Sequence, residues 1–287
     1  MTVTAPPLTA PPAAARPARR RFDPVLTIAL TLCVLLALIA VLGPLLAPYD
    51  PRQTDVLAAD QGPSADHLLG TDALGRDLLS RAMSGAALSL VGPALVVLVA
   101  TVGGTALALA MAWYGGRVDT VVSRMLDILL AFPSLLFAVL AVGVFGTGWA
   151  APVAALSLAY LPFLARVVRS AAVRQRHLPY MEACLMAGFS TWRINVRHLL
   201  PSLFPIIRAQ ATVAFGSALV DLAAISFIGL GVQAPDSEWG LMISEGRASL
   251  LNGSPQETLI AGTLIVLTVV AVNVLGERLA QRAEGRT

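Results

Sequence analysis

The sequence predicts an all-α, polytopic membrane helix bundle with six transmembrane helices. Of the 287 residues, 56% are hydrophobic and 13% are charged, whereas soluble domains carry about 25% charged residues. The apolar residues gather in six blocks, and each is long enough to cross a bilayer, which takes about 20 residues of helix. These blocks are continuous rather than alternating, which argues against a transmembrane β-barrel.

The chain divides into five segments in order. Residues 1–24 are rich in Ala and Pro and contain four arginines, so they predict a disordered cytoplasmic tail. The apolar run 25–47 is too long for a signal-peptide core and predicts the first transmembrane helix. An extracytoplasmic loop follows at 48–83. The membrane core is 84–276, and residues 277–287 form a second cytoplasmic tail. The core spans are expected at 84–113, 118–144, 149–173, 203–232 and 257–276.

The placement of arginine predicts the orientation. All twenty basic residues are Arg, and the chain contains no Lys. With six spans and the N-terminus inside, sixteen arginines fall on the cytoplasmic side, and only Arg52, Arg76, Arg81 and Arg247 fall outside. Because cytoplasmic loops carry an excess of positive charge, both termini are predicted to be cytoplasmic in a bacterial cell membrane.

One cytoplasmic loop, residues 174–202, is long and amphipathic. A short helix is expected over 180–187, and Gly188 suits the left-handed residue that ends many helices. Ser190 can cap a second short helix that runs toward His198, and Pro201 is expected to stop it. By physics alone, this helix pair either connects two spans or seats in a groove on a soluble partner.

The same loop resembles the EAA loop of bacterial ABC-importer permeases. That pattern has Glu-Ala-Ala, a Gly six residues after the Glu, and Ile-x-Leu-Pro ending nineteen after it. Glu182, Ala183, Gly188, Leu200 and Pro201 match it, while Cys184 replaces the second Ala and His198 replaces the Ile. Further segments resemble the dipeptide/oligopeptide/nickel branch of these permeases, in its smaller, six-span subunit. They are residues 67–81, 127–135, 226–233 and 238–240.

The resemblance implies a permease subunit of an ATP-driven importer for dipeptides or oligopeptides. The chain would form half of a translocation path as a heterodimer with a second permease subunit. Two ATP-binding subunits, which hold the ATP and Mg, would dock on the cytoplasmic side, and a substrate-binding protein on the other side. The residues implied to couple the chain to the ATPase are Glu182, Ala183, Cys184, Gly188, His198, Leu200 and Pro201.

No catalytic, metal or cofactor site is expected in this chain, and it is not expected to be an enzyme. A phosphate-binding loop of the Walker type needs a Lys, which the sequence lacks. Nucleic-acid binding is not expected either, because the positive-inside rule already explains the arginines. Within the same family, nickel or another small solute is the alternative substrate. Outside it, the alternatives are an ATPase-independent secondary transporter, which would predict inverted repeats, and a non-transporting membrane scaffold.

Three charged groups in or near the spans need an explanation. Asp221 lies within a predicted span, where a carboxylate is costly. It is a candidate pore-lining group that meets a peptide amine or a water chain, or it pairs with an Arg or a polar backbone group at the subunit interface. Asp127 is expected to pair with Arg124 on the same helix. The outer cluster of Asp72, Arg76 and Asp77 forms a structural turn or a docking surface, and the structural reading is favoured.

Overall fold

The structure is a computed structural model that describes residues 23–284, with side chains up to Gln281, so that the predicted tail before residue 23 lies outside it. The described chain is built from helices, with one isolated β-bridge between Thr71 and Asp77. The helices are α1 (Pro24–Leu46), η1 (Val56–Ala58), α2 (Leu78–Tyr114), α3 (Gly116–Leu130), α4 (Ser134–Phe145), α5 (Ala150–Arg176), α6 (Pro179–Met186), α7 (Thr191–Ile194), η2 (Asn195–Leu199), α8 (Leu200–Phe227), α9 (Trp239–Leu251) and α10 (Gln256–Glu284).

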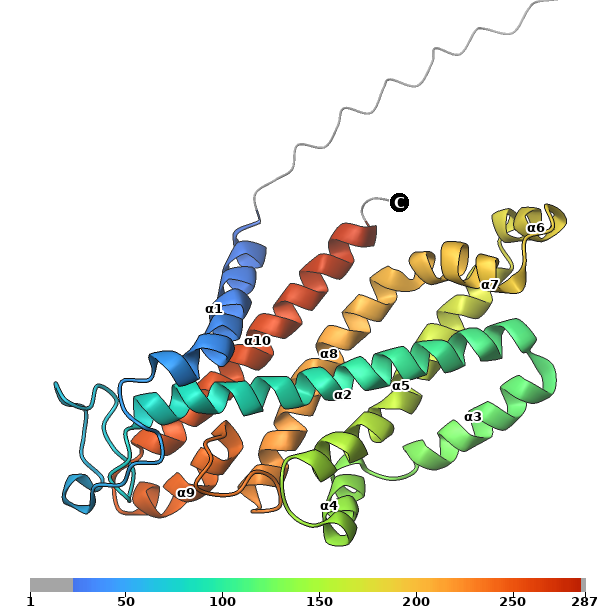
Figure 1. Cartoon of the computed structure of the whole chain (residues 1–287). Helices are drawn as coiled ribbons and strands as arrows, with labels where there is room; N and C mark the ends of the chain where they lie inside the picture. The colour runs from blue at the N-terminus through green and yellow to red at the C-terminus, as the bar shows by residue number, and fades with distance from the viewer. Residues whose placement is uncertain (1–22, 285–287) are drawn as a thin grey trace, which may run out of the picture.

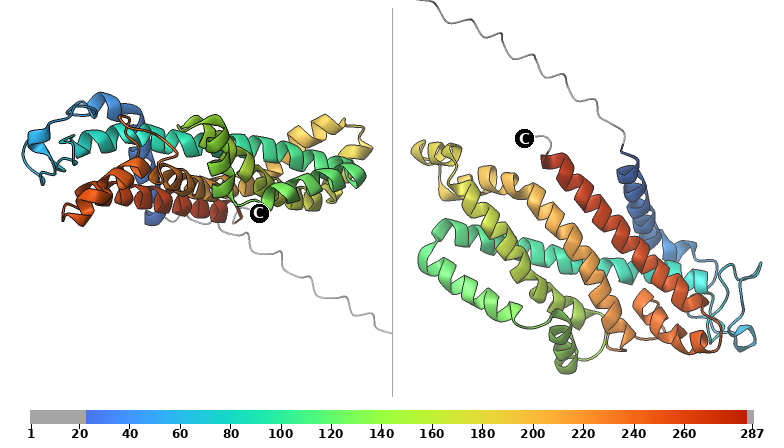
Figure 2. Two further views of the ribbon diagram at one scale, coloured as in Figure 1. Left: turned by 90° about the horizontal axis from the view of Figure 1, so that it is seen from below. Right: turned by 180° about the vertical axis from the view of Figure 1, so that it is seen from behind.

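The long helices run between two ends of an elongated bundle (Figure 1). The α6 end holds α6, α7, the first turn of α1 and the last turn of α10. The α9 end holds α9, η1 and the long loop between α1 and α2 (Figure 2). The described N-terminal and C-terminal helices therefore begin and finish on the same side of the bundle, as an even number of crossings requires.

Within residues 23–284, five helices are long and apolar enough to cross a membrane: α1, α2, α5, α8 with the short helices before it, and α10. The sixth predicted span, 118–144, is not one continuous helix. It is broken into α3 and α4, whose axes differ by 81°. The break falls at Phe132 and Pro133, because proline removes a backbone N–H and the residue before it is biased away from the helical region. With α3 and α4 taken as one bent span, the bundle has the six spans that the sequence predicts.

Several helix boundaries in the structure differ from those that the sequence predicts. α2 begins at Leu78, inside the predicted loop 48–83, because Asp77 caps it by accepting a hydrogen bond of 2.8 Å from the backbone N–H of Ser80. The stretch between the predicted spans 203–232 and 257–276 contains α9. α10 continues through residue 284, so the predicted tail begins as helix.

Pro201 does not stop the second short helix, which is a correction to the sequence prediction. α7 passes through the π-helical turn η2 directly into α8, and Pro201 stands in the first turn of α8. Proline lacks a backbone N–H, and here it directly follows the π-helical turn η2, where the regular α-helical hydrogen-bond pattern is already interrupted.

The core is packed from small residues on facing helices. α2 makes its most extensive contact with α5. Ala100 and Ala108 of α2 and Ala165 and Ala172 of α5 are all fully buried. Small side chains let helix backbones approach closely in membrane proteins, where apolar surface alone gives no preference for protein over lipid. Large apolar side chains of α1, such as Val41 and Leu45, instead point outward, as a lipid-facing helix requires.

Candidate functional site

The elbow, defined as α6, the turn 187–190 and α7, has the helix–turn–helix form that the sequence predicts. Gly188 has a φ of +76°. The N–H of Phe189 donates to Cys184 O at 3.2 Å, and the N–H of Gly188 donates to Leu185 O at 3.0 Å. These two bonds make a Schellman motif, in which a residue with positive φ satisfies the last carbonyls of a helix. Ser190 then caps α7 by accepting from the N–H of Arg193.

Buried apolar side chains attach the elbow to the spanning helices. Met181 and Ile194 are about 99% buried, and Leu199 is fully buried in η2. They pack with small and β-branched residues of α2 and α5 in one core cluster, which includes Ala112 and Val168. Because closely packed groups move together, a displacement of the elbow is passed to α2 and α5.

The elbow carries large apolar side chains that are unusually exposed. Met186 is 90% exposed and Trp192 is 77% exposed, and Leu185 is half-exposed. Apolar side chains of this size, gathered on a compact unit, mark an interaction surface. Glu182 is exposed beside them in the first turn of α6 and forms no ion pair with the described side chains, residues 23–281.

Of the remaining residues in the predicted coupling set, some are exposed and others pack against the spanning helices. Ala183 and Pro201 are exposed. Cys184 and Leu200 pack against the core cluster that holds the elbow. His198 stacks on the ring of Phe189 with centroids 5.9 Å apart, so it links η2 to the turn after Gly188. The structure thus brings all seven residues to the α6 end.

Asp221 lies between three helices. Its Oδ2 accepts hydrogen bonds from the Tyr160 hydroxyl of α5 and the Ser134 hydroxyl of α4, each at 3.0 Å. The sequence analysis names an arginine or a polar backbone group as the alternative partner, whereas the partners in the described chain are side-chain hydroxyls. Asp127, by contrast, pairs with Arg166 of α5 rather than with Arg124 on its own helix.

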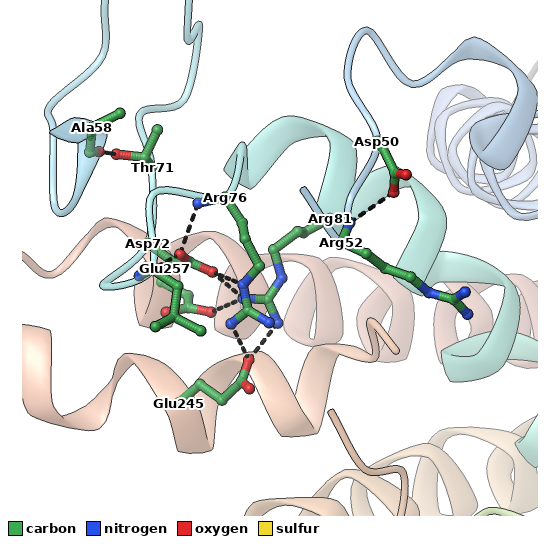
Figure 3. Close-up of polar contacts among 10 residues, drawn as sticks. Asp50, Arg52, Ala58, Thr71, Asp72, Arg76, Arg81, Glu245 and Glu257 are labelled. Carbon is green, nitrogen blue, oxygen red and sulfur yellow. Dashed lines mark hydrogen bonds and ion pairs between the residues drawn. The ribbon is translucent and has the colours of Figure 1, made fainter. Parts of the chain in front are cut away.

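Buried ion pairs join the segments at the α9 end. The sequence analysis names only some of the residues that form them. The Arg76 Nε donates to Asp72 Oδ2 at 2.6 Å, and Arg81 pairs with Asp72, Glu245 and Glu257. Figure 3 shows the two guanidinium groups side by side with these carboxylates around them. Arg81 is fully buried and Asp72 is 1% exposed, so this cluster ties the α1–α2 loop to α9 and α10. That geometry supports the structural role that the sequence favours.

A second buried carboxylate fixes the start of α9. Glu238 accepts from the N–H groups of Gly240 and Leu241 at 3.0 and 2.9 Å. Burial raises the pKa of this carboxyl above its usual range, although hydrogen bonds from these N–H groups oppose the shift. The adjacent Trp239 is fully buried and donates its Nε1–H to Ala82 O at 3.0 Å. The α9 end is therefore rigidly connected to α2.

Comparison with known proteins identifies the family. The profile of the binding-protein-dependent transport system inner membrane component matches residues 104–287. The chain belongs to this family. The N-terminal TM domain of oligopeptide transport permease C matches residues 18–63. The chain is thus a multi-pass membrane permease subunit of the ABC-importer type, and such permeases function with ATPase and substrate-binding partners.

Individual relatives agree with the family. The dipeptide transport system permease protein DppC of Alkalihalophilus pseudofirmus is 40% identical over 243 residues, which are 84% of this chain and 79% of the relative. The glutathione transport system permease protein GsiD of Pectobacterium atrosepticum is 36% identical over 247 residues, 86% and 82% of the two chains. The di/tripeptide transport system permease protein DppC of Pseudomonas aeruginosa is 37% identical over 252 residues, 86% and 83% of the two chains.

A solved structure has the same fold. The MetNI methionine ABC transporter in an inward-facing conformation matches with a TM-score of 0.55 and 19% identity, over 69% of this chain and 94% of the other. At that identity the match shows the fold of the ABC permease.

Proposed function

We propose that this permease forms half of the path by which an ATP-driven importer takes up short peptides. A second, different permease subunit supplies the other half. Two ATPase subunits bind the elbow and hold the ATP and Mg, and a substrate-binding protein docks at the α9 end. The observation that carries the proposal is the elbow itself: it exposes large apolar side chains on both of its helices, Met186 and Trp192, and it is attached to α2 and α5 by buried side chains.

The charge distribution supports an orientation with the elbow in the cytoplasm of a bacterial cell. Within residues 23–281, the segments toward the α6 end carry ten arginines and five carboxylates, and those toward the α9 end carry four arginines and ten carboxylates. The ten arginines are Arg117, Arg124, Arg166, Arg169, Arg174, Arg176, Arg193, Arg197, Arg208 and Arg278. By the positive-inside rule this end faces the cytoplasm, and both termini with it.

The proposed substrate class is short peptides. The relatives at 40% and 37% identity are named for dipeptides and for di- and tripeptides, and the relative at 36% is named for glutathione. Glutathione is itself a tripeptide, so one chemical class covers all three. Nickel chelates and other small solutes are the competing cargo.

The test measures uptake in a strain whose chromosomal copy of this gene is deleted and which carries the gene on a plasmid. Labelled dialanine, glutathione and nickel are supplied in turn, with the partner ATPase intact or inactivated in its nucleotide site. We expect ATPase-dependent uptake of a peptide. Uptake of nickel alone would assign the other cargo, and peptide uptake that persists without the ATPase would indicate a secondary transporter.

A further inference from the structure

The carboxylate of Asp221 differs in its partners from three other carboxylates of the spanning helices, Asp119, Asp127 and Glu257. Asp119, Asp127 and Glu257 each pair with an arginine. Asp221 forms no ion pair with any side chain of residues 23–281, and the chain has no lysine to offer one. Its charge is met by two hydroxyls, those of Ser134 and Tyr160, and both donate to the same oxygen.

The surroundings of Asp221 indicate water or a polar ligand rather than lipid. Asp221 is partly exposed, and Ser217, one turn earlier on the same face of α8, is exposed. The residue lies about 9 Å along the helix axis from the last residue of α8, at 1.5 Å per residue. A carboxylate at this depth is costly against lipid tails and normally faces a cavity or a partner.

The backbone beside Asp221 supports the same conclusion independently. Ser134 is the first residue of α4, directly after the break at which α3 and α4 bend by 81°. At membrane depth, non-helical backbone occurs where it is buried in protein or lines a water-filled cavity. The break and the carboxylate meet at one place on the bundle, since Ser134 donates to Asp221.

We propose that Asp221, with the hydroxyls of Tyr160 and Ser134, binds the primary ammonium group of a peptide as it passes through the transporter. The inference rests on the proposed function. An ammonium group has three donors and no acceptor. The second carboxylate oxygen, Oδ1, accepts no hydrogen bond from the described residues, and each hydroxyl oxygen keeps acceptor capacity while it donates to Asp221. The cluster thus presents three acceptors to one cation.

The test measures water access and local charge at Ser217, which lies one turn before Asp221 on α8, with its hydroxyl near that of Tyr160. In a background with Cys33→Ser and Cys184→Ala, Ser217→Cys is placed in the full transporter. It is treated with a cationic and with an anionic methanethiosulfonate reagent, each rate being normalised to that of a free thiol. We expect both reagents to react and the cationic one to be favoured about tenfold, because a carboxylate in a low-dielectric wall concentrates cations.

The matched variant is Ser217→Cys with Asp221→Asn, which keeps the shape of the side chain and removes its charge. The cationic preference should fall to about one, and dialanine should protect the cysteine only when Asp221 is present. A lipid-facing control, Val41→Cys on α1, should react with neither reagent.

Two outcomes would overturn the assignment: a Ser217→Cys side chain that neither reagent reaches, or a reagent preference that is the same with and without Asp221. ATPase-dependent dialanine uptake by the Ser217→Cys transporter is measured in parallel. If the reagent test fails while the Ser217→Cys transporter still takes up dialanine, the ammonium site is wrong. If the unsubstituted transporter takes up no dialanine, the proposed function is wrong.

Discussion

Arg81 and Glu257 are separated by 176 positions in the chain, yet Arg81 Nη1 lies 3.1 Å from Glu257 Oε1, both side chains being buried. The pair joins the first turn of α2 to the first turn of α10. Because Asp72 and Glu245 bind the same guanidinium group, one arginine connects the α1–α2 loop, α9 and two spanning helices.

Replacing Arg81 by Met should destabilise the permease severely. The substitution leaves Asp72, Glu245 and Glu257 buried with fewer compensating charges, and breaking a buried pair from one side costs about 3–5 kcal/mol. The measurement is the thermal midpoint of the purified permease in detergent. The control is Arg52→Ala, which removes an exposed pair with Asp236 worth about 0–1 kcal/mol. Equal midpoints for the two variants would refute the role given to the cluster.

Gly240 is required by close packing of α9 on α8. A Cβ at this position would lie 2.4 Å from the backbone oxygen of Ala223, so Gly240→Ala must move α9 away from α8. A loss of about 1–3 kcal/mol is expected from such overpacking. Gly262→Ala on α10 is the matched control, because its Cβ meets nothing within 4 Å. The control should be neutral or stabilising by about 0.5–1 kcal/mol, and a destabilisation as large as that of Gly240→Ala would count against this account.

Gly188 should matter for coupling through its backbone alone. No atom lies within 4 Å of an added Cβ, but the φ of +76° disfavours a β-branched residue. Gly188→Val is expected to insert and assemble normally while peptide uptake falls at least about tenfold, if a strain of about 1–2 kcal/mol displaces the elbow. Gly188→Asn, which tolerates positive φ, should retain most of the uptake. Undiminished uptake by the Val variant would remove Gly188 from the coupling mechanism.

The orientation predicts where reporters function. Alkaline phosphatase fused after Thr287 should be inactive, and fused after Asp60 in the α1–α2 loop it should be active, because that enzyme needs the oxidising periplasm. A cytoplasmic fluorescent protein should give the reverse pattern. Activity of the phosphatase at Thr287 would invert the topology and place the elbow outside the cell.

Local patterns in the sequence predict much of this fold. Continuous apolar blocks are enough to place the spans, and the left-handed Gly188 follows from the helix-ending pattern around it. The break in the third span is not predictable in this way. Pro133 stands within an apolar block like Pro93 of α2, yet α2 stays helical through its proline. Whether a proline kinks or breaks a helix depends on the neighbouring helices that satisfy the freed backbone groups.

The polar contacts depend even more on tertiary structure. Asp72 and Arg76 are close in sequence and visible as a cluster, whereas Glu245 and Glu257 join them only through the folding of α9 and α10 onto α2. In the same way Asp221 is recognisable as an intramembrane charge, but its partners Ser134 and Tyr160 come from other helices. The sequence holds one signal for the Arg81–Glu257 pair: each residue stands at the outer end of an apolar run.

The most direct test of the central claim is a cross-link between the elbow and the ATPase. Met186→Cys is introduced in the background with Cys33→Ser and Cys184→Ala, and Asp60→Cys at the α9 end serves as the control. The assembled transporter is treated with a short photoactivatable thiol cross-linker. The account predicts that Met186→Cys joins to the ATPase subunit with a yield that changes when ATP is bound, and that Asp60→Cys does not. An ATPase adduct from Asp60→Cys, or none from Met186→Cys in an active transporter, would contradict it.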